Sequence, residues 1–213
     1  MALIRVNATR MELNKTKKRL RSSQRGHKLL KDKRDDLVKK LVVMATRSRD
    51  IRKIVERELA AVYEGMSIAE ALMSPLAMEA AMMTPKQSVS LLTNVQNLMG
   101  VEIPVYEYKM KYTGDIIPYG YYGTSIELDN ALLALNNALP HLLELAQIEK
   151  SVQLLSQEIE KTRRTVNALE FVRIPNLQQT VKYIRMKLDE NERGNITRLM
   201  KVKDSITHTA GEP

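Results

Sequence analysis

The chain has 213 residues, no cysteine, no tryptophan and a net charge of +9. These features exclude a disulfide framework and a thiolate metal site, and no run of about 20 apolar residues indicates a membrane-spanning helix. Because only 4% of the residues are aromatic, the apolar residues favour long helical packing over a thick globular core.

The first predicted element is a long helix over residues 9–73. Thr9 and Glu12 have the spacing of a capping box, which indicates that the helix begins there. A heptad template over 13–58 places apolar residues at eight of its fourteen seam sites. This stripe predicts a partner helix, and its main seam residues are Leu30, Leu37, Met44 and Ile51.

A middle segment, 74–123, is expected to contain short helices and a β-hairpin. The Ser74–Pro75 pair is typical of an N-cap followed by the first turn of a helix. Over Tyr106–Tyr112, aromatic and apolar residues alternate with charged ones, which indicates a strand. Turn-forming residues follow at 113–115, so the sequence predicts a hairpin that turns there and returns through 116–119.

The second long helix is predicted over 124–206, followed by a flexible tail, 207–213. Thr124–Glu127 forms another capping box at its start. After Pro175 the apolar stripe resumes one residue out of register, as in a kinked helix that keeps facing its partner, and Pro140 should bend the helix similarly. The seam residues of this helix are Val152, Leu155, Ile159, Val166, Leu169, Val181, Ile184 and Leu188.

These elements predict a fold dominated by α-helices, a single elongated domain over 1–213. Neither helix can bury its stripe alone, so the simplest arrangement is a long antiparallel two-helix coiled coil, or helical hairpin, with a short β-hairpin in its middle insertion. Antiparallel pairing would bring the two basic ends of the chain together, away from its acidic middle. Residues 1–50 alone carry sixteen Lys/Arg against five Asp/Glu.

No residue pattern indicates an active site. The three histidines are scattered, and the glycine motifs that bind phosphate are absent. We therefore expect no catalytic, cofactor-binding or metal-binding residue. Gly26 is isolated within the first predicted helix, which indicates either the close approach of a neighbouring element or simple tolerance.

Two other features leave alternatives open. The ten Lys/Arg over 15–34 suit a nucleic-acid contact, but no aromatic residues for base stacking accompany them, so a solvated helix face is the competing interpretation. A group of methionines fits either an adaptable docking surface or core gap-filling, the commoner use. These are Met66, Met73, Met78, Met82 and Met83.

Two blocks of the sequence resemble the D subunits of archaeal and bacterial V-type (A-type) ATPases. That family's amino-terminal helix is similar to NATRMEL at 7–13 and GHKLLKDKRDDL at 26–37. Its carboxy-terminal helix is similar to TRRTVNALEFVRIPNL at 162–177 and YIRMKLDENER at 183–193. The resemblance implies a central-stalk rotor subunit that couples ATP hydrolysis or synthesis to rotation of a membrane ion-translocating ring.

The resemblance also implies partners and a location. The expected partners are the A and B subunits of the catalytic ring, the F subunit, and the C subunit, also called d, on the membrane rotor ring. We expect no cofactor, no nucleic acid, no direct membrane insertion and no catalysis by this chain, which should lie in the cytoplasm, peripheral to the inner face of the plasma membrane. The alternatives are a basic cytoplasmic coiled-coil export stalk or chaperone, or a nucleic-acid-binding protein.

In such a machine the basic ends of the chain would meet carboxylates that line the catalytic ring. Exposed ion pairs are individually weak, so they can break and re-form as the shaft turns. The apolar seam would supply torsional stiffness instead. The expected ring-contact residues are Lys15, Lys17, Arg19, Arg25, Lys28, Lys31, Arg34, Arg163, Arg164, Lys182 and Arg185.

Overall fold

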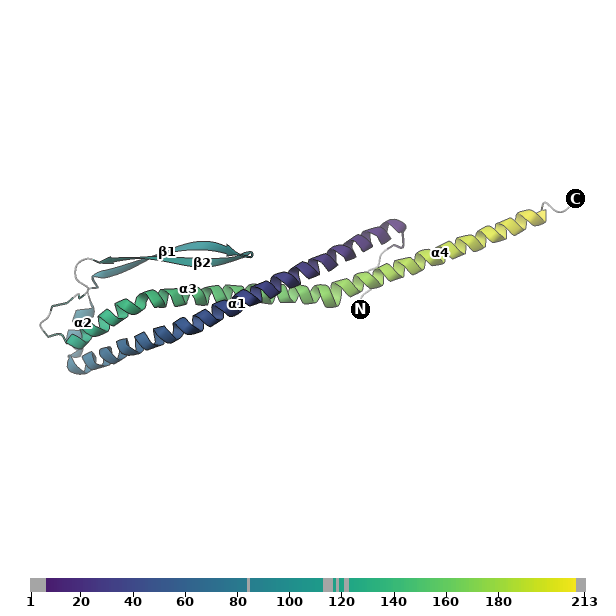
Figure 1. The fold of residues 1–213 in the computed structure, drawn as a ribbon. Helices are drawn as coiled ribbons and strands as arrows, with labels where there is room; N and C mark the ends of the chain where they lie inside the picture. The colour runs from purple at the N-terminus through teal and green to yellow at the C-terminus, as the bar shows by residue number, and fades with distance from the viewer. Residues whose placement is uncertain (1–6, 84, 113–116, 118, 121–122, 210–213) are drawn as a thin grey trace. The chain divides into compact units, whose positions relative to one another are not determined.

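Long helices dominate the computed structural model, which describes residues 7–83, 85–112, 117, 119–120 and 123–209 (Figure 1). The elements are, in order, α1 (Arg10–Leu72), α2 (Pro75–Met82), β1 (Gln87–Leu98), β2 (Val101–Tyr112), α3 (Ile126–Ala168), the π-helical turn η1 (Leu169–Arg173) and α4 (Ile174–Thr209). Because 79% of the structure is helical and its two strands lie between the long helices, the expected helical hairpin with an inserted β-hairpin is confirmed.

The chain divides into two compact units. The end unit contains Met1–Asp35 and Glu160–Pro213, and the middle unit contains Asp36–Ile159. Helices α1 and α3 each contribute residues to both units. Within the middle unit, α3 continues through Pro140, and the bend expected there stays a prediction.

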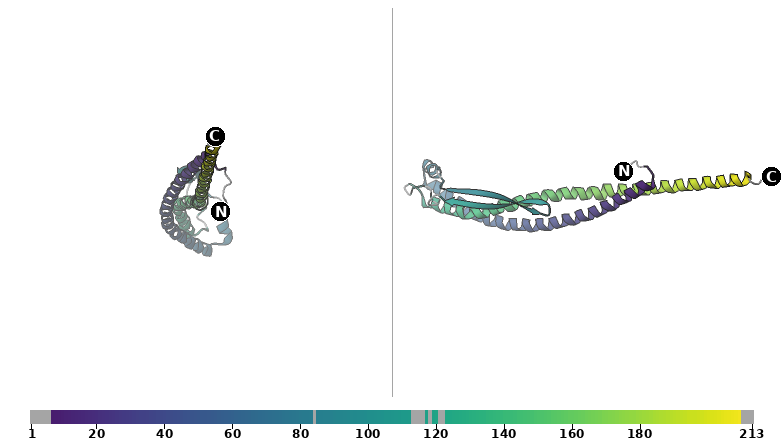
Figure 2. Two further views of the ribbon diagram at one scale, coloured as in Figure 1. Left: turned by 90° about the vertical axis from the view of Figure 1, so that its right-hand side faces the viewer. Right: turned by 90° about the horizontal axis from the view of Figure 1, so that it is seen from above.

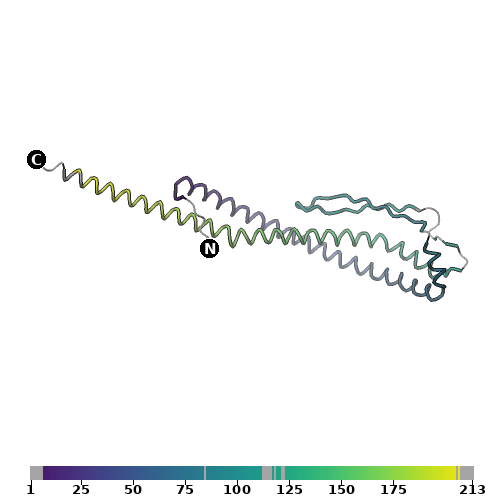
Figure 3. Tube along the Cα trace, turned by 180° about the vertical axis from the view of Figure 1, so that it is seen from behind, coloured from purple at the N-terminus to yellow at the C-terminus, as the bar shows by residue number. Residues whose placement is uncertain are grey.

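In the middle unit, α1 and α3 run antiparallel. Arg52 on α1 pairs with Glu149 on α3, whereas Glu58, farther along α1, has its Oε2 atom 3.0 Å from Nδ1 of His141, farther back on α3. The opposite directions of the two helices can be followed in the tube of Figure 3. The apolar stripes of the two helices therefore face each other in the way that the heptad pattern requires.

Side-chain caps fix the beginnings of the first two helices. The backbone N–H of Glu12 donates to Thr9 Oγ1 at 3.2 Å, so one half of the predicted capping box is present. The N–H of Ala77 donates to Ser74 Oγ at 3.3 Å, and Pro75 occupies the first turn of α2. Both starts confirm the sequence-based prediction, because each side chain satisfies an N–H that has no partner inside the helix.

The predicted cap of α3 is wrong by one residue. The N–H of Glu127 donates to Ser125 Oγ at 3.2 Å, so Ser125 caps the helix. Thr124 instead donates its hydroxyl to the carbonyl oxygen of Gly120 at 3.0 Å. Serine is the better N-cap of the two, and the hydroxyl of Thr124 is already bonded to Gly120.

The register change near Pro175 has a local cause. The N–H of Ile174 donates to the carbonyl of Leu169, five residues earlier, so η1 contains one residue more than an α-helical turn. A wider turn suits this position because proline has no N–H and its ring crowds the preceding turn. The extra residue shifts the apolar stripe by one, as the sequence predicted, and α4 then buries Leu177 and Ile184.

A two-residue turn, Met99–Gly100, closes the β-hairpin of twelve-residue strands. Both turn residues have positive φ, 56° and 87°, as in the type I′ turn, whose twist matches that of paired strands. The Oδ1 atom of Asn97 accepts a hydrogen bond from the N–H of Gly100 at 2.8 Å. Methionine rarely adopts positive φ, which is why the sequence did not indicate this turn.

The hairpin therefore begins earlier in the chain than predicted. β2 contains the strand expected over Tyr106–Tyr112. The expected turn at 113–115 lies outside the described residues, and Ile117 and Tyr119, expected on the returning strand, lie in no strand. The partner of β2 is instead β1, and β1 has no charged residue to mark one of its faces.

The hairpin packs on the helices of the middle unit, and Figures 1 and 2 show it alongside α3. Val101 and Ile103 of β2 are buried in one cluster with Leu37 of α1 and Leu155 of α3. Two strands alone are marginally stable in water, so this apolar contact is what stabilises the hairpin.

The five methionines divide between the two interpretations. Met73 is buried where α1, α2 and α3 meet, and Met66 and Met78 pack against the same cluster. Met82 and Met83 are 43% and 76% exposed. Three of the methionines therefore fill the core, and two remain on the surface.

The closest helix–helix approach at a glycine is at Gly65. A Cβ atom placed there would lie 3.2 Å from Cβ of Ala131 on α3. At Gly26 a Cβ would have no neighbour within 4 Å. Simple tolerance is therefore the interpretation that holds for Gly26, whereas a glycine that the sequence did not single out permits the close contact.

Candidate interaction surface

The expected coiled-coil seam lies along the covered side of the helices. None of its twelve residues is exposed. Leu37, Leu155, Val166 and Ile184 are almost completely buried, with exposed fractions of 0 to 1%. The half-buried members are Leu30, Met44, Ile51, Val152, Ile159, Leu169, Val181 and Leu188.

Four hydroxyl residues are also buried, Thr16, Ser151, Thr162 and Thr180. Thr16 occupies a seam site of the heptad template over 13–58, whereas sequence reasoning missed the other three. Ser151 and Thr180 each donate a hydrogen bond of 2.7 Å to the carbonyl four residues earlier, so burial leaves these hydroxyls satisfied. The heptad spacing could have found Thr162, because it lies seven residues after Leu155 and seven before Leu169.

All eleven expected ring-contact residues lie in the end unit. Nine of them are exposed, whereas Lys17 and Arg34 are half-buried. The structure therefore places on one compact unit basic side chains that lie more than a hundred residues apart in the sequence.

Three of these basic residues already have an acidic neighbour. Arg34 donates to Oδ1 of Asp35 from Nε at 3.0 Å and from Nη2 at 2.7 Å. Arg164 pairs with Glu160, and Lys15 Nζ lies 3.9 Å from a carboxylate three residues earlier. The others form no ion pair with any residue that the structure describes, and they are Lys17, Arg19, Arg25, Lys28, Lys31, Arg163, Lys182 and Arg185.

Charge differs strongly between the two units. The residues of the end unit include 23 Lys/Arg and 10 Asp/Glu, a net charge of +13. Those of the middle unit include 11 Lys/Arg and 15 Asp/Glu, a net charge of −4. Electrostatic attraction to an acidic partner is therefore a property of the end unit.

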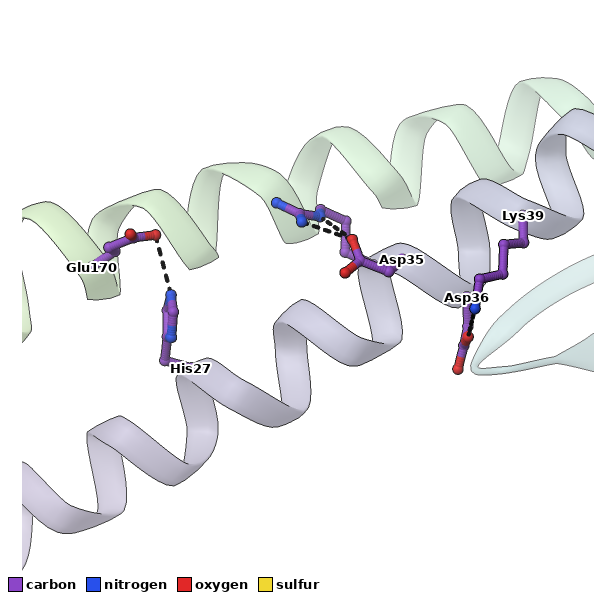
Figure 4. A network of polar contacts seen from close by, with 6 residues as sticks. His27, Asp35, Asp36, Lys39 and Glu170 are labelled. Atoms are coloured by element: carbon purple, nitrogen blue, oxygen red, sulfur yellow. Dashed lines mark hydrogen bonds and ion pairs between the residues drawn. The ribbon is translucent and has the colours of Figure 1, made fainter.

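Polar contacts across the helices hold the end unit in an antiparallel register. His27 Nε2 lies 3.2 Å from Glu170 Oε2, as Figure 4 shows, and Arg10 Nη2 lies 3.8 Å from Glu192 Oε1. Exposed pairs of this kind contribute roughly 0 to 1 kcal/mol each. These contacts identify which residues are neighbours, while the apolar seam supplies most of the stability.

A hydrogen bond connects Tyr119, which precedes α3, to that helix. Its hydroxyl donates to Oδ1 of Asp129 at 2.5 Å. Burial, followed by this hydrogen bond, raises the pKa of Tyr119 well above the usual tyrosine value. The contact is structural, because the hydroxyl stays protonated and has its partner inside the unit.

Among the described residues, no three His, Asp or Glu side chains gather in a way that could hold a metal ion. No described helix combines the length and the apolar composition that crossing a bilayer requires.

Comparison with known proteins identifies the family. The family model of the ATP synthase D subunit matches residues 12–204. The V-type ATP synthase D subunit of Acetivibrio thermocellus is 56% identical over 212 residues, which are 99% of this chain and 96% of the relative. Relatives with the same name from Clostridium botulinum and Clostridium novyi are 52% and 51% identical, over 95% and 97% of both chains. Matches of this extent, on a helical hairpin with an inserted β-hairpin, show that the chain belongs to the family of V-type ATP synthase D subunits.

Proposed function

We propose that the chain is the central-stalk rotor subunit of a V-type (A-type) ATPase. It couples ATP hydrolysis or synthesis in a ring of A and B subunits to rotation of the membrane ion-translocating ring. The observation that carries this proposal is the similarity of nearly the whole chain to V-type ATP synthase D subunits, at 51 to 56% identity. The chain is noncatalytic, and its contribution is mechanical.

The mechanism follows from linked equilibria. Nucleotide binding and hydrolysis change the relative free energies of the ring's conformations, and an asymmetric shaft makes one arrangement the most stable at each angle. Chemistry at the ring therefore drives rotation of the shaft. Because coupling between equilibria is reciprocal, torque applied to the shaft drives the ring toward ATP synthesis.

The buried seam is the part of the chain suited to transmitting torque. Leu37 and Leu155 are fully buried in one cluster with Val101 and Ile103 of β2 in the middle unit, and Val166 and Ile184 are buried in the end unit. Close-packed side chains resist deformation because moving them opens voids or forces strained rotamers. The helices of each unit therefore twist as one body.

The basic surface of the end unit is the part suited to turning inside the ring. Eight of the eleven expected ring-contact residues form no ion pair with a described residue. These eight, including Lys28, Arg163 and Arg185, can bind carboxylates of the A and B subunits. Each exposed pair contributes only about 0 to 1 kcal/mol, so no single contact holds the shaft at one angle. Many weak, exchangeable contacts keep the shaft centred while it turns.

The remaining contacts follow from the same role. The chain binds the F subunit, is seated on the C (d) subunit, and lies at the inner face of the plasma membrane without entering the bilayer. The parts of the chain would share these tasks: helices α1, α3 and α4 would form the shaft, and the segment between α1 and α3 would serve docking. Helix α4 continues to Thr209, so residues 207–209 of the expected tail are helical, and residues 210–213 lie outside the described residues.

The two alternative functions lack support. An export stalk or chaperone would share the helices and the charge, and a nucleic-acid binder would share the basic surface. The relatives described above are all V-type ATP synthase subunits. A nucleic-acid binder would also retain DNA or RNA at physiological salt, with affinity that falls steeply as salt rises.

Affinity purification of the tagged chain from its own cells, followed by identification of the recovered proteins, tests the proposal. Recovery of A, B, F and C (d) subunits is the expected result. Recovery of an export apparatus or of nucleic acid without A and B subunits would overturn it. Treatment with nuclease before purification is the control, because it removes proteins that are joined only through nucleic acid.

A further inference from the structure

Strand β1 has an open outer edge. Among the residues that the structure describes, the sheet has two strands, and β1 pairs only with β2. Ten of the twelve residues of β1 are exposed, and its two end residues are half-buried. At roughly 3.3 Å per residue, the strand offers an edge about 40 Å long.

The backbone groups that β1 directs outward can be identified from one hydrogen bond. In an antiparallel ladder, bonded residue pairs alternate with pairs whose N–H and C=O groups point away from each other. The N–H of Tyr106 on β2 donates to Gln147 Oε1 at 2.9 Å, so Tyr106 and its partner Thr93 form an outward pair. The other outward residues of β1, at two-residue spacing from Thr93, include Val89, Leu91 and Val95.

The two edges of the hairpin differ in protection. On β2, Pro104 stands at an outward position, where its missing N–H removes no bond to β1, and α3 occupies the N–H of Tyr106. β1 contains no proline and no charged residue, and its pairing register has no bulge. Edge strands avoid pairing with other chains by means of prolines, charged side chains and bulges. β1 has none of these features, so it is open to a further strand.

We propose that the outer edge of β1 accepts an extended, uncharged segment of another subunit of the ATPase complex as a third strand. The proposal rests on the proposed function, because the incoming segment belongs to another subunit of the complex that this function requires. Val89, Leu91 and Val95 share one face of β1 and are 44%, 45% and 65% exposed. The incoming segment therefore carries apolar residues at alternate positions, which cover these side chains while its backbone bonds to the edge.

A second copy of this chain is a poorer occupant. A single pair of strands buries much less than the roughly 1,200 Å² typical of a specific, stable interface. Two free chains would therefore not stay associated through this edge alone. Inside a complex, other contacts hold the incoming segment nearby, so the edge needs to supply only part of the binding free energy.

Hydrogen exchange of the assembled complex tests the proposal with a control in the same strand. In the free chain the outward N–H groups of Val89, Leu91, Thr93 and Val95 should exchange quickly, whereas β2 protects those of Ser90, Leu92 and Asn94. In the complex the outward groups should exchange at least about tenfold more slowly. Unchanged outward exchange in a complex that contains A and B subunits would overturn the proposal. Failure of the wild-type chain to recover A and B subunits would overturn the proposed function as well.

Site-directed crosslinking identifies the occupant. The chain has no cysteine, so a Thr93→Cys variant carries a single benzophenone maleimide at the edge. The expected product joins position 93 to an extended segment of another subunit. Crosslinking only to a second copy of this chain, or to no protein, would contradict the proposal.

A proline at the same position blocks the edge. Thr93→Pro removes an outward N–H and no bond to β2, so the hairpin should remain folded and Ser90 should stay protected. In the complex, the outward groups at Leu91 and Val95 should lose their protection. Thr93→Val is the matched control, because it keeps the N–H and should behave as the wild type. Equal protection in both variants would count against a third strand.

Discussion

Replacing Leu155 by alanine tests whether the buried seam stabilises the middle unit. Leu155 is completely buried in one cluster with Leu37, Val101 and Ile103. The substitution removes three carbon atoms, worth roughly 2.4 kcal/mol at about 0.8 kcal/mol per buried methylene. A residual cavity adds to this, so we expect a loss of about 3 kcal/mol in the free energy of unfolding.

Urea unfolding followed by circular dichroism at 222 nm measures this loss. Leu29→Ala is the matched control, because the same side chain is removed from a site that is 69% exposed. Its effect should stay within about 0.5 kcal/mol. The reasoning would be refuted if Leu155→Ala lost less than about 1 kcal/mol, or no more than Leu29→Ala.

The same variant also tests how the hairpin is held. Because Leu155 lies in one buried cluster with two residues of β2, its truncation should speed amide exchange along that strand. Val166→Ala removes an equally buried side chain from the end unit and should leave the exchange of β2 unchanged. Equal acceleration in both variants would mean that the hairpin does not depend on this cluster.

Three further predictions concern charge, close packing and pH. Reversing Lys28, Lys31 and Arg34 to Glu should weaken binding to the A/B ring at least about tenfold in a pull-down and leave binding to the F subunit nearly unchanged. The control is the reversal of three exposed middle-unit residues, Arg49, Lys53 and Arg57. Equal loss of ring binding in both triple variants would count against the assignment of the ring contact to the end unit. Gly65→Val should destabilise the chain by about 1 to 3 kcal/mol in urea unfolding, because a Cβ atom placed at Gly65 would lie 3.2 Å from Cβ of Ala131. Gly26→Val, at a site without neighbours, should lower the free energy of unfolding much less. Similar decreases in both variants would argue against a close approach at Gly65. The pKa of Tyr119 is raised in the folded chain, so the unfolded chain releases this proton first as pH rises. The contribution of Tyr119 to the free energy of unfolding is therefore present below about pH 10 and is lost as pH rises above it. Tyr119→Phe should reduce this loss of stability between about pH 9 and pH 11, and an unchanged loss would argue against the Asp129 hydrogen bond.

Helix pairing was predictable because it depends on regular spacing. The heptad template over 13–58 has polar residues at some of its seam sites, among them His27, Arg34 and Glu58, and all three are half-buried. The register shift after Pro175 was visible as a one-residue offset of the apolar stripe. Its cause, the π-helical turn, was not visible, because several local geometries could absorb the same proline.

The hairpin was harder to predict because its signals are local and weak. β2 alternates aromatic and charged residues, whereas the neutral residues of β1 alternate without a charged face. The turn uses Met99 in a conformation that is rare for methionine. The close approach at Gly65 also depends on which residue of α3 lies opposite, and this is known only once the register is fixed.

The basic surface was partly predictable. The density of Lys/Arg over 15–34 indicated a cationic helix face, and the antiparallel pairing brings Arg163 and Lys182 into the same unit. Which of the Lys/Arg side chains have no acidic partner depends on side-chain geometry that the spacing of residues in the sequence does not specify. Arg34 binds Asp35 through two hydrogen bonds, so its charge is less available than that of Lys28 or Lys31.

Rotation of single complexes tests the central proposal most directly. A cysteine introduced at an exposed site of the chain, which has none of its own, would carry a bead while the A/B ring is fixed to a surface. We expect the bead to turn in one direction when ATP is supplied and to stop when ATP is removed. ATP hydrolysis by the same complexes with a stationary or randomly moving bead would contradict the proposed role as a rotor shaft.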